Sequence, residues 1–244
     1  MKTKNIWLLM TLTAVMAFIG CSESGLTGTW MGYDGNDWEI KFDNKNWEDS
    51  YDGNSFTKGT YTTSGKSLTR IVTHIYGNSF DRALESKWYT IAEIEETGLF
   101  DEGFFADWTT TSTFSVNNHA FVQVFEDGST YVYARKQENI SKGDITGIWV
   151  IDGMGVSVRI TNIGWEITIP SYNYMDTGTY ERDGTHGRLT SDTAGSMVGT
   201  ADLLNENFMS VTLNQYTIAP GTHLLRRESF VINRDLAPPE PRGD

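Results

Sequence analysis

Apolar and polar residues alternate in short runs along much of the chain. Residues 38–43 read Trp-Glu-Ile-Lys-Phe-Asp, and residues 156–161 read Val-Ser-Val-Arg-Ile-Thr. A period of two places successive side chains on opposite faces, so each run predicts a strand with one face in a core. Turn-forming sequences such as those at 43–46 and 126–129 separate the runs. Short strands joined in this way predict an antiparallel meander.

The series of strands occurs twice. Gly-Thr-Trp at 28–30 and Gly-Thr-Tyr at 59–61 have counterparts in Gly-Ile-Trp at 147–149 and Gly-Thr-Tyr at 178–180, with the same 31-residue spacing between the glycines. The distance from one copy to the next, from Gly28 to Gly147, is much longer than a solenoid unit, which repeats every 20 to 50 or so residues. The repeat is therefore a duplicated domain. The predicted domains are residues 26–136 and 145–234, joined by a linker at 137–144.

The first copy is longer than the second. Thr90 and Glu93 have the spacing of a capping box, which predicts a short helix at about 91–97, and Gly98 supplies a C-terminal stop. The extra length of the first copy is close to that of the interrupted stretch. We therefore predict a helical insertion near 80–108 in the first domain.

A Gly-x-Trp on the first strand, a run of meander strands and an Arg on the last strand resemble the lipocalin and wider calycin pattern. The resemblance implies an all-β protein of two tandem, small, antiparallel up-and-down barrels. It also implies that the first-strand Trp packs across one end of each barrel and that the last-strand Arg lies against it. The pairs would be Trp30 with Arg135 and Trp149 with Arg226.

A barrel of eight short strands is just wide enough to be filled by side chains or to hold one small ligand. Thirteen per cent of the residues are aromatic, which favours filled interiors. The insertion also carries an aromatic cluster, which could plug one barrel end or form a contact surface for a hydrophobic ligand or a protein partner. Its residues are Trp88, Phe104, Phe105 and Trp108.

The N-terminus has the features of a cleaved signal. Lys2 and Lys4 precede an apolar run at 6–19, which is too short to span a bilayer comfortably and predicts a signal peptide at 1–20. Phe-Ile-Gly-Cys at 18–21 resembles the lipobox of bacterial lipoproteins. This resemblance implies acyl chains on Cys21, a tether at 21–25, and attachment to the cell envelope, at the outer membrane. Each buried CH₂ contributes roughly 0.8 kcal/mol to such anchoring.

Charge and composition exclude several classes of function. A formal net charge of −13 disfavours nucleic acid, since phosphate backbones need Lys and Arg opposite them. The four histidines have no metal-ligand spacing, so neither a metal nor a cofactor is expected. A hydrolase that uses carboxylates of the insertion is a minor alternative; the candidates are Glu93, Glu95, Glu96, Asp101 and Glu102.

The sequence thus predicts a non-enzymatic, lipid-anchored envelope protein that acts as a binding or structural module. One alternative is a carrier of a small hydrophobic ligand within a barrel. Another is a surface adhesin, because Arg242-Gly243-Asp244 resembles the integrin-recognition tripeptide and ends a tail, 235–244, that is predicted to be disordered. A carrier requires a cavity of a few hundred Å³, whereas a structural module requires filled interiors.

Overall fold

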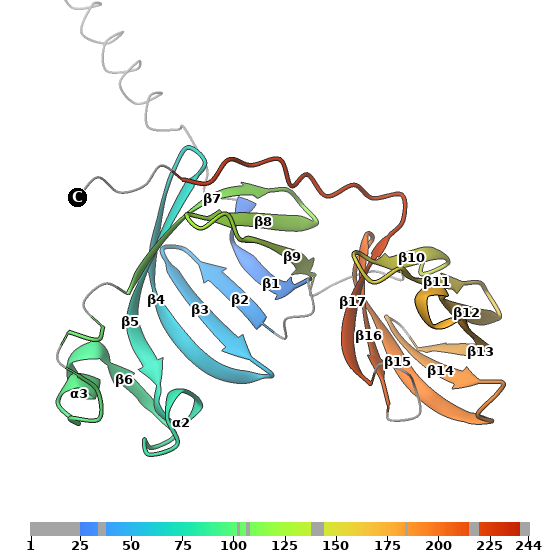
Figure 1. Cartoon of the computed structure of the whole chain (residues 1–244), viewed down its shortest axis with the longest axis horizontal. Coiled ribbons are helices and arrows are strands. Elements are labelled where there is room, and N and C mark those ends of the chain that lie inside the picture. The colour runs from blue at the N-terminus through green and yellow to red at the C-terminus, as the bar shows by residue number, and fades with distance from the viewer. Residues whose placement is uncertain are drawn as a thin grey trace, which may run out of the picture.

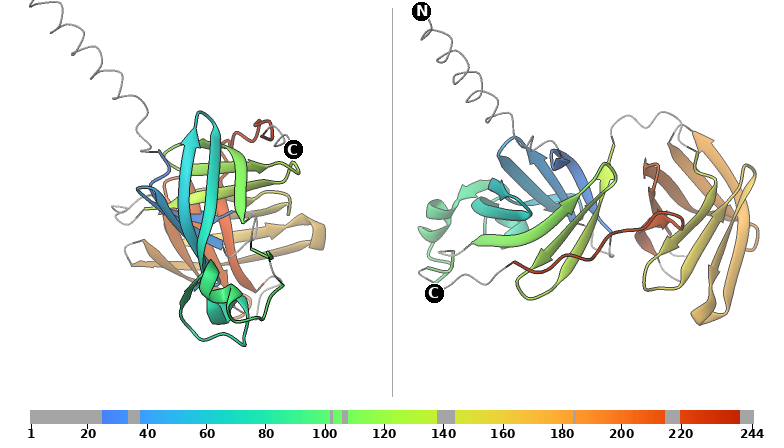
Figure 2. Two further views of the ribbon diagram at one scale, coloured as in Figure 1. Left: turned by 90° about the vertical axis from the view of Figure 1, so that its left-hand side faces the viewer. Right: turned by 90° about the horizontal axis from the view of Figure 1, so that it is seen from above.

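The computed structural model describes residues 25–33, 38–101, 103–105, 108–137, 144–183, 185–214 and 220–239. These residues form two β-barrels in succession, and a segment after the last strand runs back across the first barrel (Figure 1). The right-hand view of Figure 2 shows the same segment along the first barrel. The predicted all-β architecture of two tandem antiparallel barrels is confirmed, and its form is lipocalin-like.

Eight antiparallel strands close the first barrel, because the last of them, β9, pairs with β1. A ninth strand, β6, pairs with the final residues of β5 beyond those that pair with β7. The strands are β1 (Gly28–Gly32), β2 (Trp38–Asp43), β3 (Asn46–Tyr51), β4 (Asn54–Ser64), β5 (Ser67–Tyr76), β6 (Trp88–Thr90), β7 (Thr109–Val116), β8 (Ala120–Phe125) and β9 (Thr130–Lys136).

The second barrel also has eight antiparallel strands, closed by the pairing of β17 with β10. A 3-10 helix, η2 (Pro170–Tyr172), connects β12 to β13. The strands are β10 (Gly147–Ile151), β11 (Val156–Ile160), β12 (Gly164–Ile169), β13 (Tyr174–Asp183), β14 (His186–Ser191), β15 (Ser196–Asn205), β16 (Phe208–Leu213) and β17 (Gly221–Arg227).

The glycines that define the repeat stand where a side chain would not fit. A Cβ on Gly59 would lie 1.8 Å from a carbonyl oxygen of the neighbouring strand, and a Cβ on Gly178 would lie 1.9 Å from one. Gly28 and Gly147 have φ values of +130° and +135°, and each lies against the guanidinium group of a last-strand arginine. The repeated glycines therefore reflect the same close backbone approaches in both barrels.

The closed end of the first barrel is built around Trp30, whose side chain is fully buried. Its Nε1 donates a hydrogen bond to the carbonyl oxygen of Leu26 at 2.7 Å. The Cζ of Arg135 lies over the ring, 4.1 Å from its centre. Nη1 of Arg135 donates to the carbonyl of Thr27 at 2.8 Å, and Nη2 donates to that of Gly25. The arginine thereby fastens the segment before β1 to the end of the barrel.

The second barrel repeats this arrangement around Trp149, which is also fully buried. Its Nε1 donates to the carbonyl oxygen of Ile145 at 2.8 Å. The Cζ of Arg227 lies 4.5 Å from the centre of the Trp149 ring, and its Nη1 donates to the carbonyl of Thr146 at 2.8 Å. The two copies therefore share one way of closing an end.

The arginine at this position was predicted to be Arg226, and that assignment is wrong by one residue. In the register of β17 with β10, Arg227 lies opposite Trp149 and Arg226 lies opposite Val150. Because successive side chains of a strand point to opposite faces, only Arg227 reaches the tryptophan. Arg226 instead binds the carboxylate of Asp152, with Nη2 2.7 Å from Oδ1.

The insertion comprises α2 (Gly77–Phe80), β6 and α3 (Ile91–Glu95), and it extends beyond the open end of the first barrel (Figure 1). The predicted capping box is present, since Glu93 N donates to Thr90 Oγ1 and Thr90 N donates to the Glu93 carboxylate at 2.7 Å. No helix among the described residues is long and apolar enough to cross a membrane. The insertion packs on the end of β5 in a small separate core: Ile75, Leu84, Tyr89, Ile94 and Phe105.

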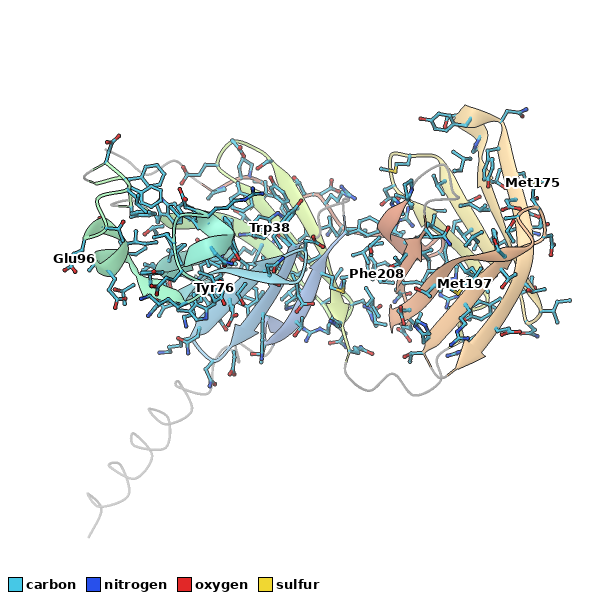
Figure 3. The ribbon with its side chains drawn as sticks, turned by 90° about the horizontal axis from the view of Figure 1, so that it is seen from below. Trp38, Tyr76, Glu96, Met175, Met197 and Phe208 are labelled. Carbon is cyan, nitrogen blue, oxygen red and sulfur yellow. The ribbon has the colours of Figure 1, made fainter. Side chains whose placement is uncertain are left out.

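A hydrophobic core also lies between the two barrels, which the sequence analysis did not anticipate. Phe208 is fully buried at its centre, with the rings of Tyr33 and Phe230 at 5.4 Å in edge-on contact. Figure 3 shows Phe208 between the barrels. The core joins Tyr33, which follows β1, and outward-facing residues of β8 and β9 to the second barrel, and Met31 of β1 packs against it. Its buried residues are Tyr33, Ala120, Val122, Val132, Ala134, Leu204, Phe208 and Leu224.

Polar contacts flank this interface core. The hydroxyl of Tyr33 donates to the carbonyl oxygen of Val150 and accepts from the backbone N–H of Asp152, both at 3.3 Å. Burial acts to raise the pKa of Asp152, but the hydrogen bonds and charge of Arg226 hold that pKa below its ordinary value. The carboxylate therefore stays ionised and keeps Arg226 in place beside the interface.

The chain after β17 covers the interface core from one side. Phe230, Ile232 and Leu236 pack against it, and Nη1 of Arg226 donates to the carbonyl of Phe230 at 2.8 Å. The tail was predicted to be disordered from residue 235 onward, but Leu236 still packs against the interface core. Residues 240–244, which include the Arg-Gly-Asp sequence, lie outside the described residues, as do Cys21 and most of the predicted linker.

Candidate ligand-binding site in the first barrel

The two barrel interiors differ in how completely they are filled. The hollow in the second barrel has a volume of about 50 Å³ and is bordered mainly by aliphatic and aromatic side chains. At the open end of the first barrel there is a cavity of about 400 Å³. Its border includes both aromatic and charged side chains: Trp38, Asp49, Arg70, Phe125, Tyr131 and Tyr133. The first barrel is therefore the one with room for a ligand.

Strand alternation explains how polar groups reach this interior. Trp47 and Asp49 occupy alternate positions of β3, as do Leu68 and Arg70 on β5. Trp47 and Leu68 belong to the core of the first barrel. Because alternate residues of a strand share a face, Asp49 and Arg70 point to the same interior, one step nearer the open end.

Arg70 borders this cavity and has a buried donor without a hydrogen-bond partner among the described residues. Its Cζ lies over the ring of Trp47, 4.8 Å from the centre. Its Nε is shielded from solvent and has no hydrogen-bond partner, and none of the hydrogen bonds or ion pairs among the described residues involves its guanidinium group. A guanidinium group has five N–H donors. Burial lowers the pKa of Arg70, an effect opposed by the neighbouring Tyr133 and by the charge of Asp49.

Asp49 lies near Arg70 without forming an ion pair with it. Its side chain is 9% exposed, and its Oδ1 accepts hydrogen bonds from N and Oγ1 of Thr57 at 2.8 and 2.7 Å. Burial raises the pKa of Asp49, although the Thr57 hydrogen bonds and the charge of Arg70 act in the opposite direction. Thr57 therefore fixes the carboxylate by two hydrogen bonds, and Asp49 acts on Arg70 through its charge and not through a hydrogen bond.

A buried amide adds to the polar interior. Gln123 on β8 is fully buried, and its Nε2 donates to Oγ of Ser112 at 2.7 Å, while Ser112 donates onward to the carbonyl of Leu68 at 3.4 Å. Its Oε1 has no partner in the described part of the chain. The interior of the first barrel thus combines an apolar closed end with polar groups nearer the open end.

Aromatic rings surround the open end. Trp38 contacts Tyr51 at 5.2 Å and Phe56 at 5.3 Å between ring centres, and Figure 3 labels it on the first barrel. Phe56 in turn lies 5.9 Å from Phe80 of α2, which links this wall to the insertion. On the other side Phe125 and Tyr131 make an edge-on contact at 5.4 Å. The rings provide flat apolar surface next to the charged groups.

The predicted aromatic cluster of the insertion is only partly brought together. The ring centre of Phe105 lies 4.8 Å from those of Phe104 and Trp108. Phe105 is buried, whereas Phe104 is 50% exposed. Trp88 lies apart, against Tyr76 and under the Nζ of Lys58 at 4.2 Å. Tyr89 takes the inward position on β6, so its neighbour Trp88 faces the other way.

A scan against models of protein families finds no match for this chain, and a search of curated proteins finds none either.

None of the described acidic residues of the insertion borders the cavity, and Glu102 lies outside the described residues. Glu93 is engaged in the capping box, and Glu95 and Glu96 are exposed; Figure 3 shows Glu96 at the far end of the insertion. The histidines lie in separate places, with His119 beside Glu206 and His186 beside Asp202. Within the described ranges, no three His, Cys, Asp or Glu residues are grouped to hold a metal ion.

Sequence reasoning did not assign Asp49, Arg70 or Gln123 to a barrel interior. A signal was present, because each is a polar residue two positions after an apolar one, at a strand position that alternation assigns to the core: Trp47, Leu68 and Phe121 precede them. A polar residue on the core face of a strand needs a partner. Where the protein supplies none, a ligand becomes a candidate.

Proposed function

We propose that the protein is a non-enzymatic binding protein of the bacterial cell envelope, anchored by acyl chains on Cys21, that holds one small organic ligand in the open end of its first barrel. The observation that carries the proposal is the cavity of about 400 Å³. Small-molecule sites typically measure about 300–1,000 Å³ and combine apolar walls with a few polar groups. The borders of this cavity have that composition.

The two barrels have different parts in this proposal. The second barrel has a packed core that includes Trp149, Trp165 and Met209, and its hollow of about 50 Å³ is too small for a carrier. The shared hydrophobic core joins it to β1, β8 and β9 of the first barrel. The second barrel therefore supports the wall of the first barrel on the side where Phe125 and Tyr131 border the cavity.

Blocking the cavity tests the proposed function. Ser129 borders the open end, and Ser129→Trp adds an indole there, with the loss of only the hydrogen bond between the Ser129 side chain and the exposed Asp127. We expect the variant to bind the neutral dye N-phenyl-1-naphthylamine at least about tenfold more weakly than the wild type, as measured by fluorescence titration.

The matched control is Ser196→Trp, which adds the same ring at an exposed position where β15 begins in the second barrel. Its affinity for the dye should equal that of the wild type. If Ser129→Trp binds the dye as well as the control does, the first barrel is not the binding site.

The anchor is tested separately. Mass spectrometry of the native protein should find an acylated Cys21, and Cys21→Ser should move the protein from the membrane fraction to the soluble fraction. The physical reason is the cumulative burial of acyl CH₂ groups in the bilayer. Native protein with an unmodified Cys21 would contradict this part of the proposal.

A further inference from the structure

We infer that the ligand of the first barrel is an organic anion, with a carboxylate, sulfonate or phosphate group that binds Arg70 and an aromatic or apolar frame that lies against the rings of the open end. This inference rests on the proposed function, because it specifies the chemistry of the ligand at the same site.

The first step is the unmet hydrogen-bonding capacity of Arg70. A buried donor without an acceptor destabilises the folded state, and the penalty is larger for a charged donor. The arginines at the two closed ends show how this chain ordinarily satisfies such groups, since Arg135 and Arg227 donate to backbone carbonyls of the segments beside them. Arg70 has no such carbonyl among the described residues, and it borders a cavity. A ligand with acceptor oxygens would complete its surroundings.

The second step is the position of the cation. The contact with Trp47 holds the guanidinium carbon 4.8 Å from the ring centre, and such a contact limits the motion of the group before any ligand arrives. The N–H groups of arginine lie in one plane in a fixed fork, which matches the paired oxygens of carboxylate, sulfonate and phosphate groups. A preoriented fork favours a planar or tetrahedral oxyanion over a single hydroxyl.

The third step concerns the two carboxylates that border the same cavity. Asp127 is exposed, and its Oδ1 accepts a hydrogen bond from the backbone N–H of Ser129 at 2.8 Å, within its own turn. Asp49 is directed by Thr57 and forms no ion pair with Arg70. Neither carboxylate occupies the guanidinium group, although the charge of Asp49 opposes an incoming anion. Removing that charge should therefore strengthen binding.

The fourth step concerns the aromatic or apolar frame of the ligand and the rings that would contact it. Trp38, Phe125 and Tyr131 border the cavity on different strands. Flat ring surfaces favour apolar or aromatic groups of similar size. An inorganic anion would satisfy Arg70 but would leave these surfaces in contact with water.

The test compares two dyes with the same anilinonaphthalene frame, 8-anilinonaphthalene-1-sulfonate and the neutral N-phenyl-1-naphthylamine, on the full-length mature protein. We expect the wild type to bind the sulfonate at least about tenfold more tightly, which is the ratio expected for one hydrogen bond to a charged group. Arg70→Met keeps an unbranched apolar stem and should remove this preference, while its affinity for the neutral dye stays within about twofold.

A second variant keeps the test independent of the stability of Arg70→Met. Asp49→Asn is nearly isosteric and removes the opposing charge, so it should bind the sulfonate more tightly and the neutral dye unchanged. Equal affinities of the two dyes for the wild type, or equal losses for both dyes in Arg70→Met, would overturn the inference and leave the proposed function standing. If neither dye binds the wild type, the proposed function is wrong and the inference falls with it.

Discussion

Replacing Trp149 with alanine is expected to lower the free energy of unfolding of the second barrel by about 3–5 kcal/mol, the usual cost of removing a large buried aromatic side chain. The indole is fully buried in the core of that barrel. Its loss would also leave the carbonyl of Ile145 without its donor and the guanidinium group of Arg227 without the ring beneath it. The effect should therefore lie near the upper end of the range.

The measurement is urea unfolding combined with hydrogen exchange, which locates the loss of protection in β10–β17. Trp88→Ala is the matched control, because Trp88 is only half-buried and belongs to the insertion. The control should leave the protection of both barrels unchanged. Wild-type protection of β10–β17 in Trp149→Ala would show that the closed end does not depend on the indole.

Replacing Phe208 with alanine is expected to uncouple the two barrels, with a loss of about 3–5 kcal/mol from the interface and the adjacent end of the second barrel. The ring is fully buried and contacts Tyr33 of the first barrel and Phe230 of the chain after β17. It therefore touches all three parts that meet at the interface. In calorimetry, we expect the wild type to unfold in one transition and the variant in two.

Phe100→Ala serves as the comparison, since it also removes an aromatic ring, but one whose ring contacts are to Phe80, Phe104 and Phe105 of the insertion and which lies outside the interface core. It should leave the barrels unfolding together. A single transition at the wild-type temperature in Phe208→Ala would mean that the interface contributes little to stability.

The sequence predicted the barrels because their determinants are local and occur twice. Alternation gives the strands, the capping box of Thr90 and Glu93 gives α3, and the glycines at 28, 59, 147 and 178 mark close approaches that recur in both copies. The register at the last strand could not be predicted in the same way. Two adjacent arginines fit the motif equally well, and only the pairing of β17 with β10 selects Arg227.

The interface could have been predicted in part from the sequence of β8, which does not alternate apolar and polar residues. Residues 120–124 of β8 are all buried, because inward residues such as Phe121 face the barrel core while Ala120 and Val122 face the second barrel. A nearly continuous apolar strand indicates burial on both faces. The cavity is harder to predict, since its volume depends on how side chains from several strands fill the interior.

The bond between Arg135 and Gly25 has a consequence for how the molecule stands on a bilayer. It ties the start of the described chain to the closed end of the first barrel, only four residues after Cys21. Four residues reach at most about 14 Å when fully extended. With Cys21 acylated as proposed, the base of the first barrel is kept close to the lipid headgroups, while Gly32 and Trp38 mark the opposite rim, where the cavity opens. Solutes would then reach the cavity from the aqueous phase.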